Sequence, residues 1–141
     1  MAWTPRAVGE RATWTRTVTA DDVERYAELT GDRNPLHFDE VFAAGTHFGR
    51  LVAQGGIGAG LFNALVAMEL PGPGSVFLHQ EWDYPAPVYI GDTVTAEAEV
   101  VASRADKPIT KLRCIARNQE GVEVMRGECL VYTMLPENDP G

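Results

Sequence analysis

The sequence has few cysteines, no long apolar run and no excess of basic residues. Its two cysteines, Cys114 and Cys129, have no CxxC spacing, which argues against a zinc site. No apolar run approaches the roughly 20 residues that a membrane-spanning helix needs, so no membrane association is expected. The formal net charge of −8 at pH 7 argues against nucleic acid as a partner, because an acidic surface repels its phosphates.

The N-terminus also lacks the charged-then-apolar layout of a secretory signal peptide, so a cytoplasmic location is expected. The chain has 141 residues, which is enough for one domain with a core and too few for two ordinary ones. Because it shows neither an internal repeat nor a linker, we expect a single domain over residues 1–141, with a frayed tail at 136–141. Its three histidines share no spacing, which predicts no metal site.

The segment before residue 45 predicts a strand and a short helix. Residues 8–18 are rich in β-branched and aromatic side chains, as is typical of a strand. Thr19 and Asp22 have the spacing of a capping box, which would open the helix. Gly31 is a natural stop, because glycine adopts left-handed backbone angles readily. A further helical turn is expected over residues 39–44.

Residues 55–70 predict a buried helix, because apolar side chains cover nearly all of its sides. Its first turns contain glycines at 55, 56, 58 and 60, and each costs about 1 kcal/mol relative to alanine inside a helix. This cost indicates that a neighbouring backbone or a ligand comes very close there. The spacing argues against a dinucleotide-binding loop, since Leu61 occupies the place of its third glycine.

The second half of the chain predicts an antiparallel sheet. Strands are expected over residues 75–84, 93–101, 109–117 and 122–134, with clean polar/apolar alternation in the second and third. A bulge is expected at Gly127. A hairpin turn near residues 119–121 would place Cys114 opposite residue 125 or 126, so we expect Cys114 and Cys129 to be buried free thiols. One buried helix wrapped by about five antiparallel strands is an α+β fold.

The segment Gly31-Asp-Arg-Asn-Pro-Leu-His37 places a carboxylate and an imidazole, Asp32 and His37, on either side of a proline. Such a pair on a loop is suited to acid/base chemistry. The alternative is ordinary turn chemistry, in which Asp32 and Asn34 bond their own backbone.

Residues Tyr26–Ala43 (YAELTGDRNPLHFDEVFA) resemble the signature of the MaoC-like (R)-specific (type-2) enoyl-CoA hydratases, which have the hot-dog fold. Three further segments resemble family segments in the family's order: Gln54–Gly56, Pro87–Asp92 and Asp106–Ile109. The resemblance implies an enzyme that adds water to a trans-2-enoyl-CoA and gives the (3R)-3-hydroxyacyl product, or catalyses the reverse dehydration.

The resemblance also implies roles for residues at matching positions. Asp32 and His37 match the catalytic pair that holds and activates the water, and Gly55 matches the residue whose N–H binds the thioester oxygen. A free N–H at a helix start also stabilises a developing enolate oxygen on physical grounds. Asn34 is given an orienting role. We further expect an overhang over about residues 30–53 that carries the motif, and a homodimer or dimer-based oligomer. No cofactor is expected, and the coenzyme A thioester is the substrate.

This chain departs from better-known family members at two places. It has Gln54-Gly55-Gly56 where they often have His-Gly-Met, and Gly60 where some have a small hydroxyl residue. Both changes would reshape the acyl pocket. Three alternative functions stay open: a dehydratase acting on acyl-carrier-protein thioesters, a non-catalytic module that binds acyl thioesters, and a thioesterase.

The remaining candidate residues are expected to have surface or packing roles. His47 is expected at the surface, and His79 in packing. Packing or interface roles are expected for the three tryptophans, Trp3, Trp14 and Trp82. Three basic residues are candidates for contacting coenzyme A phosphates, although a solvated surface position is the expectation for each: Arg50, Arg104 and Lys107.

Overall fold

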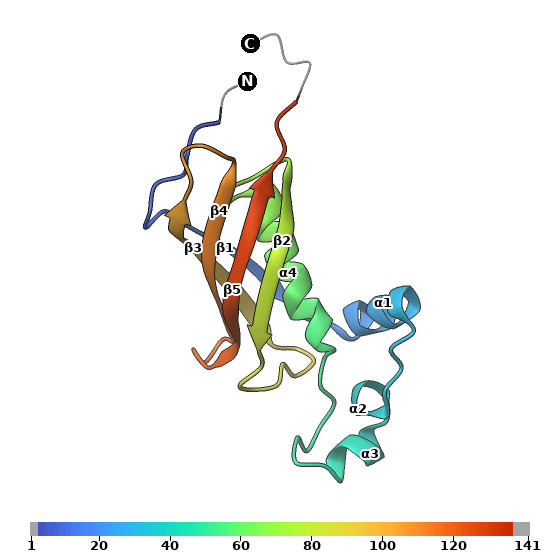
Figure 1. Cartoon of the computed structure of the whole chain (residues 1–141). Helices are drawn as coiled ribbons and strands as arrows, with labels where there is room; N and C mark the ends of the chain where they lie inside the picture. The colour runs from blue at the N-terminus through green and yellow to red at the C-terminus, as the bar shows by residue number, and fades with distance from the viewer. Residues whose placement is uncertain (1–2, 137–141) are drawn as a thin grey trace.

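Helix α4 (Gly55–Met68) lies along one face of a five-stranded antiparallel sheet in the computed structural model, which describes residues 3–136 (Figure 1). The helix buries Leu61, Phe62, Leu65 and Val66 in the core. A helix that is apolar on nearly all sides needs such cover. The predicted α+β fold, with a sheet around one buried helix, is confirmed.

The five strands are β1 (Arg11–Thr17), β2 (Ser75–Asp83), β3 (Thr93–Ser103), β4 (Ile109–Arg117) and β5 (Glu123–Thr133). They pair in the order β1-β3-β4-β5-β2, so β1 and β2 form the edges of the sheet. Along β3, Val94, Ala96, Ala98 and Val100 are buried and alternate with partly exposed residues, as the sequence predicts. No helix in residues 3–136 is long and apolar enough to span a membrane.

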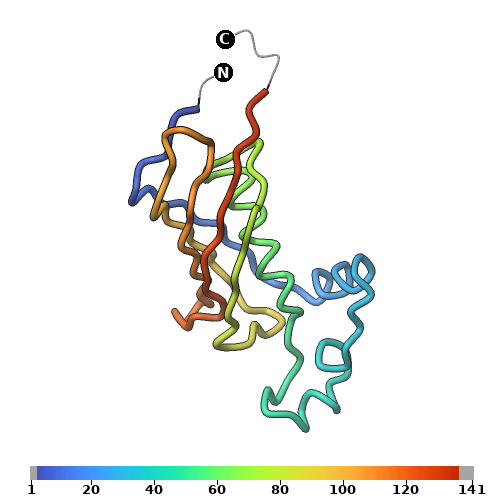
Figure 2. Tube along the Cα trace, viewed as in Figure 1, coloured from blue at the N-terminus to red at the C-terminus, as the bar shows by residue number. Residues whose placement is uncertain are grey.

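Three helices between β1 and α4 form a projection beside the sheet (Figure 2): α1 (Ala20–Thr30), α2 (Pro35–Phe38) and α3 (Glu40–Ala44). The predicted capping box is confirmed, because the Thr19 hydroxyl accepts a hydrogen bond from the Asp22 N–H at 3.1 Å and the Asp22 carboxylate accepts one from the Thr19 N–H. Arg16 bonds the same carboxylate and holds the pKa of Asp22 at about 2. Gly31 ends α1 at φ 85°.

The bulge predicted at Gly127 is wrong. Pairing runs without interruption through Gly127, which lies between Trp82 of β2 and Cys114 of β4. The register shifts instead where Ala116 pairs with Met125 and Arg117 pairs with Glu123, so the extra residue lies at position 124. This extra residue also explains why Cys114 lies opposite Gly127 and not opposite residue 125 or 126.

The two cysteines are buried free thiols, as predicted. Their Sγ atoms lie 3.9 Å apart between neighbouring strands. Contact with the Cys129 thiol, together with burial, raises the pKa of the Cys114 thiol well above its ordinary value. Both groups therefore act as small apolar side chains in the core.

The packing role predicted for His79 is wrong, because the register of β2 shifts between Phe77, which packs against the core, and His79, which faces away from it. His79 is exposed, and its Nε2 lies 3.0 Å from Oε1 of the exposed Glu81. The packing roles predicted for Trp14 and Trp82 are confirmed, since both pack against the core. The Trp82 ring also stacks on Phe62, with centroids 4.8 Å apart. The frayed tail is expected at 136–141, and residues 137–141 lie outside the described part of the chain.

Candidate active site

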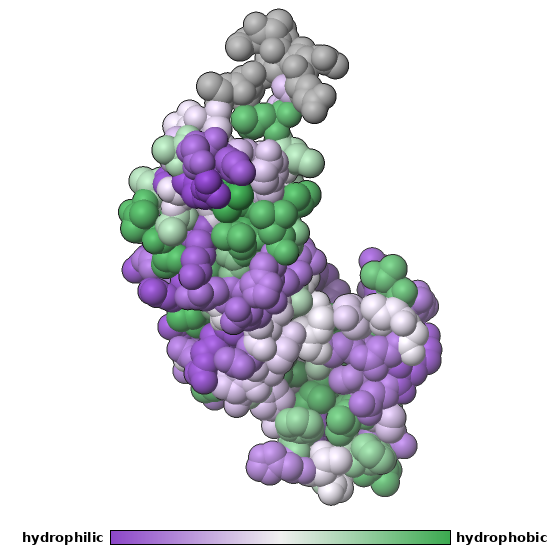
Figure 3. Space-filling view, viewed as in Figure 1, coloured by the Kyte–Doolittle hydropathy of each residue, from purple (hydrophilic) through white to green (hydrophobic). Residues whose placement is uncertain are grey.

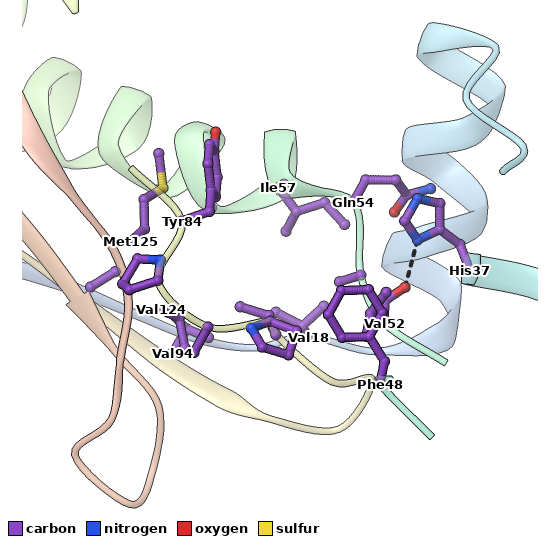
Figure 4. Close-up of a pocket in the computed structure, with 18 of the residues that line it drawn as sticks. Val18, His37, Phe48, Val52, Gln54, Ile57, Tyr84, Val94, Val124 and Met125 are labelled. Atoms are coloured by element: carbon purple, nitrogen blue, oxygen red, sulfur yellow. Dashed lines mark hydrogen bonds between the residues drawn. The ribbon is translucent and has the colours of Figure 1, made fainter. Parts of the chain in front are cut away.

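A pocket of about 410 Å³ lies between the start of α4, the sheet and the loops on either side of them (Figure 4). Its walls are mostly apolar. Its polar side chains come from His37, His47, Gln54 and Tyr84, and the remaining lining residues include Val18, Val52, Ile57, Val94, Val124 and Met125. An apolar cavity with a few converging polar groups is the usual form of a small-molecule site.

His37 presents one defined ring nitrogen to this site. It lies on α2 and is 8% exposed, and its Nδ1 is 2.6 Å from the Val52 carbonyl oxygen (Figure 4). A carbonyl oxygen can only accept a hydrogen bond, so Nδ1 carries the proton. Neutral His37 therefore has its lone pair on Nε2, where it can act as a base.

Asp32 faces that nitrogen from the segment between α1 and α2. Its Oδ2 lies 3.8 Å from His37 Nε2, which is longer than a direct hydrogen bond. Its side chain is 43% exposed, while Oδ1 accepts a hydrogen bond from the Asn34 N–H at 3.3 Å. The carboxylate and the imidazole are therefore placed to bind one small polar molecule, such as water, between them.

The side chain of Asn34 stabilises this segment. Its side-chain oxygen accepts a hydrogen bond from the Leu36 N–H at 3.1 Å and so caps α2, which begins at Pro35. Asn34 does not line the pocket described above. The turn bonds of Asp32 and Asn34 are thus present, and the same turn holds the Asp32 carboxylate near the His37 imidazole.

The start of α4 provides a free N–H in the pocket wall. Gly55 is the first residue of α4, and no group within residues 3–136 accepts a hydrogen bond from its N–H. The helix dipole adds partial positive charge at this end. Such a donor is suited to a developing oxyanion.

Close approaches exist at three positions of the glycine-rich helix start, but they come from side chains and not from the neighbouring backbone that the sequence predicted. A Cβ at Gly55 would lie 3.1 Å from the Tyr84 ring, at Gly56 1.6 Å from the Tyr26 hydroxyl, and at Gly58 3.1 Å from Met125 Sδ. Gly60 differs, since nothing lies within 4 Å of an added Cβ there.

Tyr84 lies in the pocket wall beside the helix start. Its partial burial and its proximity to the Tyr26 phenol raise the pKa of the Tyr84 hydroxyl. The phenol therefore stays neutral at physiological pH.

Gln54 joins the two halves of the site. It is 2% exposed, and its Nε2 donates to the Val23 carbonyl at 3.0 Å and to the Asp32 carbonyl at 3.5 Å. Because both partners are acceptors, the amide nitrogen must face them and Oε1 must point elsewhere. Within residues 3–136, Oε1 has no partner. Gln54 therefore ties the Asp32 segment to the start of α4, a link that only its departure from the family pattern could have suggested.

Replacing Gln54 by Leu is expected to lower kcat/KM for the reaction at this site by about threefold to tenfold, since a hydrogen bond contributes roughly 0.5–1.5 kcal/mol. The reason is loss of the donor that holds the main-chain carbonyl of Asp32. Steady-state kinetics and a thermal melt of the same sample would distinguish a loss of kcat/KM caused by lost positioning from one caused by unfolding. Unchanged kinetics in a folded Q54L variant would contradict the positioning role.

Several pocket residues lay outside the sequence prediction. His47 is exposed as predicted, yet it also lines the pocket, together with Phe48 and the loop of residues 84–88. These residues belong to loops without periodicity, so no sequence pattern marks which way their side chains point.

Comparisons with known proteins agree with this geometry. A family model described as a MaoC-like domain matches residues 6–121. The chain is 43% identical over 124 residues to an (R)-specific enoyl-CoA hydratase of Aeromonas caviae, covering 88% of this chain and 92% of that protein. It is 39% identical over 125 residues to a mitochondrial 3-hydroxyacyl-[acyl-carrier-protein] dehydratase of Solanum lycopersicum, covering 86% and 72%.

A solved structure is similar over nearly the whole chain. The (R)-hydratase from A. caviae involved in PHA biosynthesis superposes with a TM-score of 0.87 at 41% identity, covering 92% of this chain and 98% of that chain. The hot-dog fold predicted from the sequence is thereby confirmed.

Proposed function

Because the chain belongs to the MaoC-like family of hydratases and dehydratases, we propose that it is an (R)-specific enoyl-CoA hydratase. It would add water to a trans-2-enoyl-CoA and form the (3R)-3-hydroxyacyl-CoA, or catalyse the reverse dehydration. The observation that supports this most directly is the Asp32 carboxylate 3.8 Å from His37 Nε2, with His37 in the pocket wall shared with Gly55.

The proposed reaction needs a base, an acid and an oxyanion donor. Water held between Asp32 and His37 loses a proton to this pair as its oxygen forms a bond to C3 of the substrate. The electrons of the double bond move toward the thioester carbonyl, whose developing charge the Gly55 N–H stabilises. A proton from the pair then completes the C2–H bond, so the elements of water are added and the enzyme is regenerated.

The test is the absorbance of the conjugated enoyl thioester, which disappears on hydration. Crotonyl-CoA and longer enoyl-CoA substrates are each expected to lose this absorbance when the wild-type protein is added. Oxidation of the product by an (R)-specific 3-hydroxyacyl dehydrogenase would check the configuration. Absence of turnover across chain lengths would contradict the proposal. Binding measured by calorimetry without turnover would indicate a non-catalytic module. Release of free thiol would indicate a thioesterase.

A second candidate function is dehydration of acyl-carrier-protein thioesters, which the similarity to the Solanum lycopersicum protein favours. The two candidates share the same site and differ in the carrier of the acyl group. Turnover of crotonyl-CoA and crotonyl-acyl-carrier-protein at matched concentrations would separate them. A much higher kcat/KM for the carrier-protein substrate would favour the second function.

We also propose that the protein forms a homodimer through β2. This strand is an edge of the sheet, and it exposes Val76 at 46% and Leu78 at 53%. In the space-filling view, apolar side chains gather over the upper part of the sheet, where β2 begins and β5 ends, while hydrophilic side chains cover the part below (Figure 3). An edge strand that pairs antiparallel with its own copy satisfies its free backbone groups with two-fold symmetry. Light scattering at micromolar concentration would test this, and a monomer would contradict it.

A further inference from the structure

Nearly all basic side chains of the described chain are neutralised by carboxylates. Ion pairs join Glu or Asp to ten of the twelve lysines and arginines, all of which lie within residues 3–136. Only Arg50 and Lys107 have no carboxylate partner in that part of the chain. Arg104, by contrast, pairs with Asp106 and fits the surface role expected for it. No carboxylate of the described chain competes with an anionic ligand for these two cations.

Arg50 lies beside the pocket and its guanidinium is held in place. It follows Gly49, which turns the chain at φ 77°, and its neighbours Phe48 and Val52 line the pocket. Its guanidinium lies over the Tyr89 ring, 3.8 Å from the centroid. The Tyr89 hydroxyl donates to the Phe48 carbonyl at 3.0 Å. The ring is thus fixed to the pocket wall.

Stacking of this kind leaves the N–H donors at the edge of the guanidinium free. Arginine presents them in a planar fork that matches two oxygens of a phosphate. Because the ring already restricts the side chain, less conformational entropy is lost when an anion binds. Arg50 is therefore preorganised for phosphate recognition.

The negative charge of the protein opposes the binding of a substrate that carries phosphates. The protein carries a net charge of −8, so its field repels a substrate that carries phosphates. The pocket is lined by no carboxylate and by no lysine or arginine. An acyl thioester with its carbonyl at Gly55 would have to extend its phosphopantetheine arm out of the pocket, and a cation at the rim would offset the repulsion.

We propose that Arg50 binds a phosphate on the carrier of the substrate, at the rim of the pocket beside Phe48 and Tyr89. This inference rests on the proposed function and specifies how that site recognises its thioester. Phosphate is the shared chemistry of coenzyme A and of the phosphopantetheine arm of a carrier protein.

The experiment compares three crotonyl thioesters that differ in their phosphates: crotonyl-pantetheine has none, crotonyl-4′-phosphopantetheine has one, and crotonyl-CoA has the added nucleotide. Arg50→Gln is expected to raise KM for the phosphorylated substrates by about tenfold, which corresponds to about 1.4 kcal/mol, close to the lower end of what a hydrogen bond to a charged group contributes. The kcat of Arg50→Gln for these substrates is expected to stay unchanged. Its kcat and KM for crotonyl-pantetheine are also expected to equal those of the wild-type protein. Arg50→Lys is expected to recover part of the loss.

Lys107→Gln is the matched control, because it removes the other unpaired cation at the turn between β3 and β4. It is expected to leave KM unchanged for all three substrates. If Arg50→Gln raises KM for crotonyl-CoA alone, Arg50 contacts the nucleotide phosphates. If Arg50→Gln raises KM for both phosphorylated substrates, Arg50 contacts the phosphopantetheine phosphate.

Two outcomes would overturn the role of Arg50. Unchanged KM for every substrate would show that no phosphate binds there, and an equal loss on crotonyl-pantetheine would show that Arg50 only supports the pocket wall. Failure of the wild-type protein to hydrate any of the three substrates is a different result, because it would overturn the proposed function itself.

Discussion

Replacing Asp32 by Asn is expected to lower kcat for hydration of crotonyl-CoA by about two to four orders of magnitude, the usual contribution of a general acid or base. The amide has nearly the same shape as the carboxylate but cannot take up a proton. Its side-chain oxygen can still accept the hydrogen bond from the Asn34 N–H that Asp32 accepts at 3.3 Å. The local turn is therefore kept while the chemistry is lost.

Stability is expected to change little in this variant, because the Asp32 side chain is 43% exposed. The measurement is steady-state kinetics together with a thermal melt. Full activity of D32N would contradict the assignment of Asp32 to the acid/base pair.

Asp39→Asn is the matched control for Asp32. Asp39 is an exposed carboxylate in the same projecting segment, and its Oδ1 accepts a hydrogen bond from the Phe42 N–H at 3.0 Å as the N-cap of α3. Asparagine is an equally good cap. Asp39→Asn is therefore expected to keep nearly wild-type kcat, and a loss as large as that of Asp32→Asn would point to a general effect of charge in this segment.

Replacing Gly127 by Ala is expected to destabilise the fold by about 3 kcal/mol or more, at the upper end of the cost of overpacking. A Cβ at this position would lie 1.7 Å from the carbonyl oxygen of Glu81 and 2.9 Å from the Trp82 ring. The clash is with backbone, so no side-chain rotation relieves it. β5 and β2 would have to separate at this point.

Denaturant unfolding followed by tryptophan fluorescence would measure this effect, since Trp82 lies against Gly127. Gly60→Ala is the matched control on α4, because nothing lies within 4 Å of the added Cβ. It is expected to stabilise the protein by up to about 1 kcal/mol, the difference in helix propensity. A wild-type unfolding midpoint for G127A would contradict the close approach of the two strands.

Much of the fold and the acid/base pair follow from local sequence patterns. The Thr19–Asp22 capping box and Gly31 fix the ends of α1 through bonds between near neighbours. The alternation along β3 fixes which face is buried, because side chains on a strand point alternately to its two sides. Asp32 and His37 could be proposed as a pair because they lie five residues apart on either side of Pro35, and the principal segment of the family resemblance, Tyr26–Ala43, contains both.

The features that depend on distant parts of the chain became visible only with the assembled structure. The bulge at position 124, the edge position of β2 and the link from Gln54 to the Asp32 carbonyl each depend on pairing between separate segments. The placement of Arg50 over Tyr89 is of the same kind. Residues close in sequence constrain each other through backbone geometry, whereas contacts across tens of residues depend on strand order and loop path, which periodicity does not encode.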